Sequence, residues 1–356
     1  MIYFLSFLVL IGILMIPHEW GHYFVARLAR MKVYEYSVGA GPEIFSRVRN
    51  DVKFSLRPIP ILAYVRIAGM EPSEADHPEG FNSKSIGWRF AVLMAGSTMN
   101  MLVALIIFVA AGMTFGKVVG SRTFVSEVDP KMPGYDAGFR EGDEVLSVGG
   151  KAPKDTAEFI DLISSRPNQS VPVNVQRAGK TVALAVVPKA VVDVQRNKET
   201  GKVEKKEIGR IGVVIQGDPI FQKAGAVESI KEGFYTTVVW TQQIFVGIVY
   251  TFTHREGLKH VGGPLAIAKA AGDSAKKGLA EYAWFAGVIS INLAVFNLLP
   301  LLALDGGRIL FLIYEVVRRR RPDPQKEFIA NAVGMALLFL LLLVITAKDI
   351  HDWIVK

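Results

Sequence analysis

The sequence contains an HExxH pattern near its N-terminus, within the stretch IPHEWGHYF at residues 16–24. Residues four apart share one face of a helix, so His18 and His22 point the same way, and Glu19 lies about 100° further round. Two imidazoles in this arrangement can bind a zinc ion, and the glutamate between them can take a proton from a water molecule. The pattern therefore predicts a zinc-dependent hydrolytic site with Glu19 as its base.

The surroundings make this pattern more specific than the short string alone. It follows directly on the apolar run MIYFLSFLVLIGILMI at residues 1–16. A strongly polar group in hydrocarbon costs roughly 2.5–3.5 kcal/mol, so a chain keeps one there only when a partner offsets that cost. A bound cation is such a partner. A cleaved signal peptide is disfavoured, because no Lys or Arg precedes the apolar run.

A catalytic zinc ion also needs a third protein ligand. The chain has no cysteine, which leaves His, Asp and Glu, and its other histidines fall in loops or near the C-terminus. Asp305, in FNLLPLLALDGGR (296–308), directly follows an apolar stretch and is the better candidate. The other interpretation of LDGG is a plain helix stop. Asn292 and Asn297 precede it, and such amides in a membrane span either hold a substrate backbone, orient metal ligands or join helices.

Composition indicates a membrane protein. The 356 residues are 51% hydrophobic, with a mean hydropathy of +0.31. About 20 apolar residues are needed to cross a bilayer, and four stretches meet that length: 2–24, 88–114, 283–304 and 330–347. A fifth stretch, 234–253, is interrupted by Thr and Gln and is interpreted as interfacial. The net charge of +8 comes from basic residues beside the apolar runs, which argues against a nucleic-acid partner.

The basic residues also predict an orientation. They are concentrated between the first two spans and in the run Arg318–Arg321 after the third, so these loops should be cytoplasmic. The first and third spans then enter the membrane from its outer face, at Met1 and Ala283. At 1.5 Å per helical residue, His18 lies roughly 25 Å and Asp305 roughly 33 Å from that face. Pro300 should break or kink the third helix and shorten its reach. Both groups then lie toward the cytoplasmic side, where they can share one metal.

The outward-facing region contains a small α/β module. Alternating residues at 171–176 and 181–187, joined at Ala178–Gly179, predict a hairpin, and 157–165 predicts a short helix. The charged stretch 195–207 is interpreted as a solvated loop. The domain organisation expected is a membrane region at 1–115, the module at 116–216, an amphipathic linker at 217–282 that is extracytoplasmic or interfacial, and a second membrane region at 283–356.

The HEWGH and NLLPLLALDGG motifs together resemble the paired signatures of the site-2 protease family of intramembrane zinc metalloproteases. The chain is most similar to the bacterial branch with a PDZ domain between its membrane spans, and AGFREGDEVLSVGG (137–150) resembles part of that domain. The resemblance implies that His18, His22 and Asp305 bind Zn²⁺ and that Glu19 is the catalytic base. It assigns substrate handling to Asn292, Asn297 and Pro300.

Two further segments extend the resemblance. AGSTMN (95–100) is similar to the small-residue motif of the family's second span, and VKFSLRPIPILAYVRIAGM (52–70) to its membrane-dipping β-hairpin, which is thought to pair with an extended substrate strand. Pro60 and Tyr64 are the expected substrate contacts there. The sequence departs from the family where PILAY stands in place of a glycine pair before the tyrosine.

The resemblance implies an α-helical integral membrane protein with about four spans, located in the bacterial inner membrane. Its active site would lie near the cytoplasmic side and its PDZ-like domain outside. Its partners would be the lipid bilayer, a ligand peptide for the PDZ-like domain, and single-span membrane substrates already cut by another protease, such as anti-sigma factors or signal-peptide remnants. A non-proteolytic scaffold is the first alternative, and the complete catalytic set argues against it. A metal or proton transporter is the second, and the absence of an internal repeat argues against that.

Overall fold

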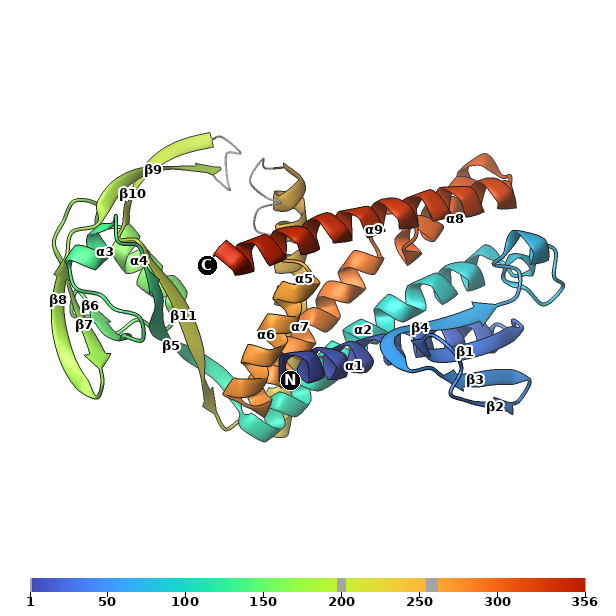
Figure 1. Ribbon diagram of the computed structural model, residues 1–356, viewed down its shortest axis with the longest axis horizontal. Coiled ribbons are helices and arrows are strands. Elements are labelled where there is room, and N and C mark those ends of the chain that lie inside the picture. The colour runs from blue at the N-terminus through green and yellow to red at the C-terminus, as the bar shows by residue number, and fades with distance from the viewer. Residues whose placement is uncertain (1, 197–202, 254–261, 356) are drawn as a thin grey trace. The chain divides into compact units, whose positions relative to one another are not determined.

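The computed structural model describes residues 2–196, 203–253 and 262–355, whose elements are labelled in Figure 1. The chain divides into two compact units. The first unit combines Met1–Thr114 with Gly225–Lys356, and the second is the intervening segment Phe115–Ala224.

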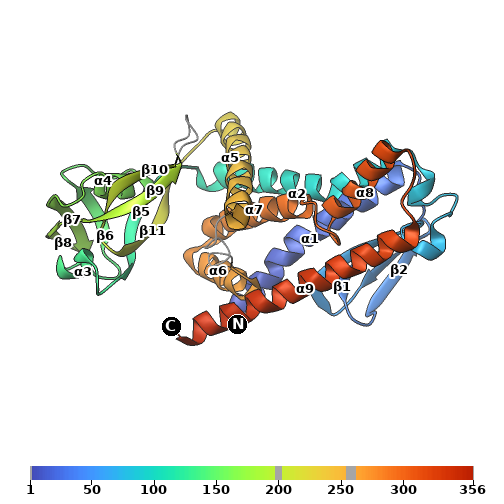
Figure 2. The same cartoon turned by 90° about the horizontal axis from the view of Figure 1, so that it is seen from above.

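The first unit is built on four long apolar helices. Within the described ranges, four helices are long and apolar enough to cross a membrane: α1 (Ile2–Leu28), α2 (Ile86–Phe115), α7 (Leu279–Asn297) and α9 (Pro324–Val355). These overlap the four predicted stretches and confirm a multi-pass membrane protein. Leu10 and Leu14 of α1 pack on Ala286 of α7, and Phe108 of α2 packs on Ile291 of α7. The three helices α1, α2 and α7 therefore form one packed group, which Figure 2 shows from above.

The third span is shorter than predicted. The stretch 283–304 was expected to span the membrane with a break or kink at Pro300; α7 already ends at Asn297, and a new helix, α8 (Asp305–Arg318), begins at Asp305. Pro300 lies exposed in the connecting turn, where its missing N–H and its restriction of Leu299 oppose a continuous helix. A β-carbon on Gly306 would stand 2.1 Å from the carbonyl oxygen of Leu299, so only glycine allows this tight return. LDGG is thus a helix start, and its interpretation as a helix stop was wrong.

A four-stranded sheet follows α1 in the first unit. Its strands are β1 (Val33–Ala40), β2 (Phe45–Arg49), β3 (Val52–Leu56) and β4 (Ile59–Ile67), in the order β2-β3-β1-β4. The expected hairpin at 52–70 is therefore wrong in its pairing, since β1 lies between β3 and β4, parallel to one and antiparallel to the other. The chain crosses the end of β1 at Gly39, where a β-carbon would meet the Arg57 carbonyl oxygen at 2.4 Å. This crossing leaves β4 as an edge strand.

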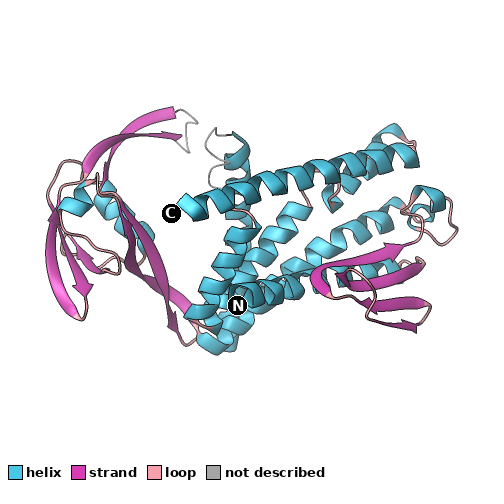
Figure 3. Ribbon diagram, in the orientation of Figure 1, coloured by secondary structure: helices cyan, strands magenta, loops and turns pink. Residues whose placement is uncertain are grey.

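The second unit contains a five-stranded sheet in the order β11-β5-β6-β7-β8. Figure 3 shows the strands in magenta. They are β5 (Lys117–Val128), β6 (Glu144–Val148), β7 (Val171–Arg177), β8 (Lys180–Val186) and β11 (Val213–Gln222), with the helices α3 (Pro133–Asp136) and α4 (Thr156–Ser164). The predicted hairpin is confirmed as β7 and β8, and the predicted helix as α4. Ala178 and Gly179 both have positive φ, as a two-residue hairpin turn requires.

Two expectations for this region need correction. Residues 203–207 are not a solvated loop but belong to β10 (Val203–Arg210), which pairs antiparallel with β9 (Lys189–Arg196). Backbone pairing tolerates charged side chains on both strands, so composition alone did not indicate it. Of the rest of that stretch, residues 195–196 end β9, and 197–202 lie outside the described residues. The second unit also extends to Ala224, because β11 runs through residues 217–222 that were assigned to a linker.

The remainder of the expected linker is helical and belongs to the first unit. It forms α5 (Ala226–Thr253) and α6 (Pro264–Lys277), while residues 254–261 lie outside the described part. Helix α5 contains the fifth apolar stretch, and it does not reach the hydropathy of the four spans. Its placement at a membrane interface stays a prediction.

Candidate metal centre

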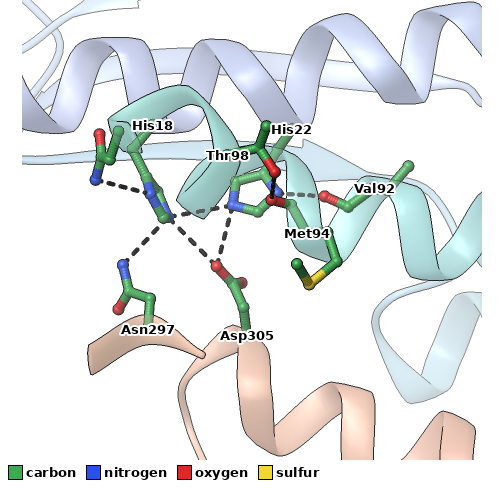
Figure 4. A network of polar contacts seen from close by, with 8 residues as sticks. His18, His22, Val92, Met94, Thr98, Asn297 and Asp305 are labelled. Carbon is green, nitrogen blue, oxygen red and sulfur yellow. Dashed lines mark hydrogen bonds and ion pairs between the residues drawn. The ribbon is translucent and has the colours of Figure 1, made fainter. Parts of the chain in front are cut away.

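Three side chains converge between α1 and the start of α8. His18 and His22 lie one turn apart on α1 and are both buried, and Asp305 opens α8. The Nε2 atoms of the two histidines are 3.2 Å apart, and each lies 3.4 Å from Oδ2 of Asp305. Figure 4 shows the carboxylate facing both rings. These three residues are a cluster that could hold a metal ion, and they are the three that the sequence singled out.

The spacing of these atoms fits zinc. Ligand atoms about 2.0–2.1 Å from a tetrahedral zinc ion lie about 3.4 Å from one another, which matches the separations of 3.2 and 3.4 Å. Oδ2 of Asp305 is also buried without a hydrogen-bond partner among the described residues. A buried carboxylate oxygen with no donor needs a cation nearby. A tetrahedral zinc ion would leave its fourth position for water or substrate.

Contacts from α2 orient the two imidazoles. Nδ1 of His22 lies 2.7 Å from the carbonyl oxygen of Val92, so Nδ1–H donates there and Nε2 keeps its lone pair for a metal. Nδ1 of His18 lies 3.3 Å from Nδ2 of Asn100, whose Oδ1 is buried without a partner. Turning the Asn100 amide by 180° lets Oδ1 accept a hydrogen bond from Nδ1–H of His18. Both histidines then present Nε2 to the same point.

Glycines allow α1 and α2 to approach closely behind the ligands. A β-carbon on Gly21 would stand 2.4 Å from the carbonyl oxygen of Ala95, and one on Gly96 would stand 2.3 Å from Nε2 of His22. Real side-chain contacts do not become this short. The small residues in AGSTMN therefore leave the space in which the imidazoles lie.

Glu19 joins this centre to the sheet. Its half-buried carboxylate lies near the backbone N–H of Val65 in β4, and the charges of His18, His22 and Asp305 act on it. Tyr36 of β1 also donates a hydrogen bond of 2.9 Å to the carbonyl oxygen of Ile16, one turn before Glu19. The edge strand β4 thus runs beside the expected base.

The other predicted site residues are less closely gathered. Nδ2 of Asn297 lies 3.4 Å from Nε2 of His18, so the last residue of α7 reaches the centre. Asn292 is half-buried further back on α7, and Pro300 is exposed in the turn that follows it. The hydroxyl of Tyr64 accepts a hydrogen bond from Arg57 at 2.9 Å, away from the metal ligands. Pro60 lies in β4, and its side chain is outside the described part of the structure.

Asn100 is the residue whose role in the site the sequence analysis did not recognise. It was noted only as the end of a small-residue motif, yet it is fully buried against His18. Asn100, like Asn292 and Asn297, is an amide within a predicted membrane span, and such an amide needs a hydrogen-bond partner. The carbonyl of Val92 left no signal in the sequence, because any residue supplies one.

Known proteins resemble this chain along almost its whole length. A model of the family described as Peptidase family M50 matches residues 6–341. Zinc metalloprotease RasP of Geobacillus kaustophilus is 28% identical over 427 aligned residues, covering 98% of each chain. Regulator of sigma-W protease RasP of Bacillus subtilis is 26% identical over 427 aligned residues, again covering 98% of each chain. A solved PDZ domain of the SdrC-like protein of Listeria monocytogenes matches at 24% identity and a TM-score of 0.20, covering 28% of this chain and 90% of that one.

The range matched by the family model, 6–341, contains the HExxH residues and Asp305, all of α2 and α7, most of α1 and the first part of α9. The Geobacillus kaustophilus relative is named as a zinc metalloprotease, in agreement with a site whose ligand atoms suit Zn²⁺. This protein is accordingly a zinc metalloprotease. The chain belongs to peptidase family M50, the site-2 protease family.

Proposed function

We propose that this protein is an intramembrane protease that hydrolyses peptide bonds in the membrane-spanning segments of other proteins. His18, His22 and Asp305 would bind the zinc ion, and Glu19 would be the general base. One observation carries this proposal. Nε2 of His18 and Nε2 of His22, both on the apolar helix α1, and Oδ2 of Asp305, at the start of α8, lie 3.2–3.4 Å from one another. No second function is favoured by a comparable cluster elsewhere in the described residues.

The bound zinc ion would supply a Lewis acid for the scissile carbonyl and lower the pKa of water toward about 7. Glu19 takes a proton from the attacking water and delivers it to the leaving amine. The Val65 N–H, which lies near the Glu19 carboxylate, would help to orient it for both transfers. Asn100 and the Val92 carbonyl keep the imidazoles oriented throughout.

A membrane substrate must unwind before it is cut, because helical peptide bonds are already hydrogen-bonded and shielded. Strand addition to the free edge of β4 would satisfy the unwound backbone. The closeness of the Val65 N–H to the Glu19 carboxylate supports this, because it sets that edge beside the base. Asn297 and Asn292 are suited to donate to substrate carbonyls, and Pro60, Tyr64 and Pro300 remain proposed substrate contacts on β4 and on the turn after α7.

The proposed orientation follows from charge. The basic loops after α1 and α8 are cytoplasmic, which brings the metal centre toward that side of the inner membrane and the second unit to the outside. The second unit acts as a PDZ-like domain that binds a peptide and admits only substrates already shortened by another protease. The name of the Bacillus subtilis relative, a regulator of sigma-W protease, suggests membrane-bound anti-sigma factors as the substrate class.

The test is to reconstitute the full-length protein in lipid vesicles with a single-span protein as substrate, and to identify the new termini by mass spectrometry. Termini within the substrate's apolar span, lost when a chelator removes zinc, are expected. Cleavage confined to its soluble part would contradict the proposal. Ala63 lies two residues from Val65 on β4, so its backbone N–H faces the same free edge, and unchanged cleavage by Ala63→Pro would argue against strand addition.

A further inference from the structure

Two adjoining cavities lie away from the metal centre, at the end of the first unit where α2 and α9 begin. One has a volume of about 230 Å³ and the other about 290 Å³. They share Ala75, Phe81 and Asn82 of the loop after β4, Arg308 of α8, and Pro324 and Glu327 at the start of α9. Their common walls make them two parts of one site. Neither is used by the proposed protease chemistry.

The smaller cavity is strongly polar. Its charged lining consists of Arg89 in the first turn of α2, Arg308 and Glu315 of α8, Arg321, Glu327 and Asp76. Three positive and three negative side chains therefore surround it, and their formal charges cancel. A balanced wall does not select a simple anion or cation. It suits a dipolar ligand with one group of each sign.

One donor in this wall lacks a partner. Arg89 is only 3% exposed, and its two terminal nitrogens bind the Glu315 carboxylate at 2.7 and 2.8 Å. Its Nε is buried without a hydrogen-bond partner among the described residues. A buried guanidinium nitrogen left unpaired is costly, so an acceptor in the cavity would stabilise it. Phosphate oxygens are acceptors that guanidinium groups bind well.

The larger cavity is apolar on the side of the membrane helix. Phe328, Ala332 and Met335 of α9 recur at helical spacing along its wall, and Met70 lies in the lining as well. These residues belong to a helix long and apolar enough to span a bilayer. The site thus changes from charged to apolar in the direction in which α9 enters the hydrocarbon. That gradient matches an amphiphile.

We propose that this pair of cavities binds one zwitterionic amino-phospholipid of the surrounding bilayer. Its phosphate lies between Arg89 and Arg308, its ammonium group faces Glu327 and Asp76, and its glycerol end lies against Ala332 and Met335. Arg89 and Glu327 both stand in the first turn of a membrane helix, which is the depth of lipid headgroups. Because Arg308 is one turn from Asp305 on α8, the lipid also helps to hold the helix that carries this candidate metal ligand.

The test uses full-length protein, delipidated in detergent and titrated with phosphatidylethanolamine, phosphatidylglycerol or soluble glycerophosphoethanolamine, with bound molecules counted by native mass spectrometry. We expect one phosphatidylethanolamine to bind about tenfold more tightly than phosphatidylglycerol, since only the former satisfies the acidic wall. Equal binding of the two lipids, or no saturable binding, would overturn the proposal. Equally tight binding of glycerophosphoethanolamine would identify a soluble ligand and refute a bilayer lipid.

Variants locate the site. Arg308→Gln and Glu327→Gln should each weaken binding about tenfold, whereas Arg320→Gln, an exposed arginine outside the cavities, should not. Ala332→Phe fills the apolar cavity without removing a charge and should also abolish binding. Its matched control, Ala336→Phe, is exposed on the same helix outside the lining. Equal loss with the Arg320 or Ala336 variant would show unspecific binding and overturn the assignment.

Discussion

A β-carbon placed on Gly96 of α2 would stand 2.3 Å from Nε2 of His22 on α1. The proposed metal ligand therefore occupies the space that a side chain at position 96 would fill. Gly96→Ala should displace the imidazole and lower zinc affinity by about 100-fold, the upper end of what changes behind metal ligands cost. Competition with a fluorescent chelator measures this affinity.

Gly87→Ala is the matched control for that substitution, because Gly87 lies on the same helix and a β-carbon there would meet nothing within 4 Å. It should leave zinc affinity unchanged. Normal zinc binding by Gly96→Ala would mean that His22 does not need this space.

Asn100 is expected to act through His18. Asn100→Ala removes the only amide within reach of His18 Nδ1 among the described residues, so the ring loses its preferred tautomer and orientation. We expect zinc affinity to fall about 10- to 100-fold with the fold intact. Thr98→Ala, two residues earlier, is the control, since the Thr98 hydroxyl bonds, within the described part of the chain, only to the Met94 carbonyl of its own helix. Equal affinities for the two variants would rule out an orienting role.

The ion pair of Arg89 and Glu315 should give stability a dependence on pH. Hydrogen bonds from Arg89 lower the pKa of Glu315 below its ordinary value of 4.5. A lowered pKa in the folded state stabilises the protein above that ordinary value, and this stabilisation is lost as pH falls through the lowered pKa. Glu315→Gln should cost about 3–5 kcal/mol at neutral pH, because Arg89 is left buried without its counter-ion.

Thermal inactivation of the wild type and of Glu315→Gln, recorded from neutral to acidic pH in lipid-free detergent, tests this account. The difference between their midpoints should be constant at neutral pH and shrink below about pH 4.5. A difference that stays constant throughout acidification would mean that the charge of Glu315 is not what stabilises the fold.

Local spacing and hydropathy were enough to predict the four apolar helices and to bring His18, His22 and Asp305 into one hypothesis. The i, i+4 relation of the histidines follows from helix geometry, and the LDGG sequence stood out because it ends an apolar stretch. The break at Pro300 was foreseen, but not that Asp305 begins a new helix, since that depends on Gly306 packing against the preceding turn.

The strand order of the sheet in the first unit could not be predicted from local spacing and hydropathy. Segments 52–56 and 59–67 alternate like a hairpin, yet β1 inserts between them, and only the close passage of Arg57 over Gly39 indicates why. Parallel pairing of β1 with β3 leaves no local turn signal. Charged β10 was missed because its pairing with β9 uses backbone groups, whatever the side chains are.

The central claim is that Glu19 is the base of a zinc-dependent intramembrane protease, and Glu19→Gln tests it most directly. The wild type and the variant are purified in detergent, their bound zinc is quantified, and their cleavage of a single-span substrate is measured. The account predicts about one zinc ion in each protein, with cleavage by the wild type only, because the amide keeps the site but accepts no proton. Cleavage by Glu19→Gln at the wild-type rate, or an active wild type without zinc, would contradict it.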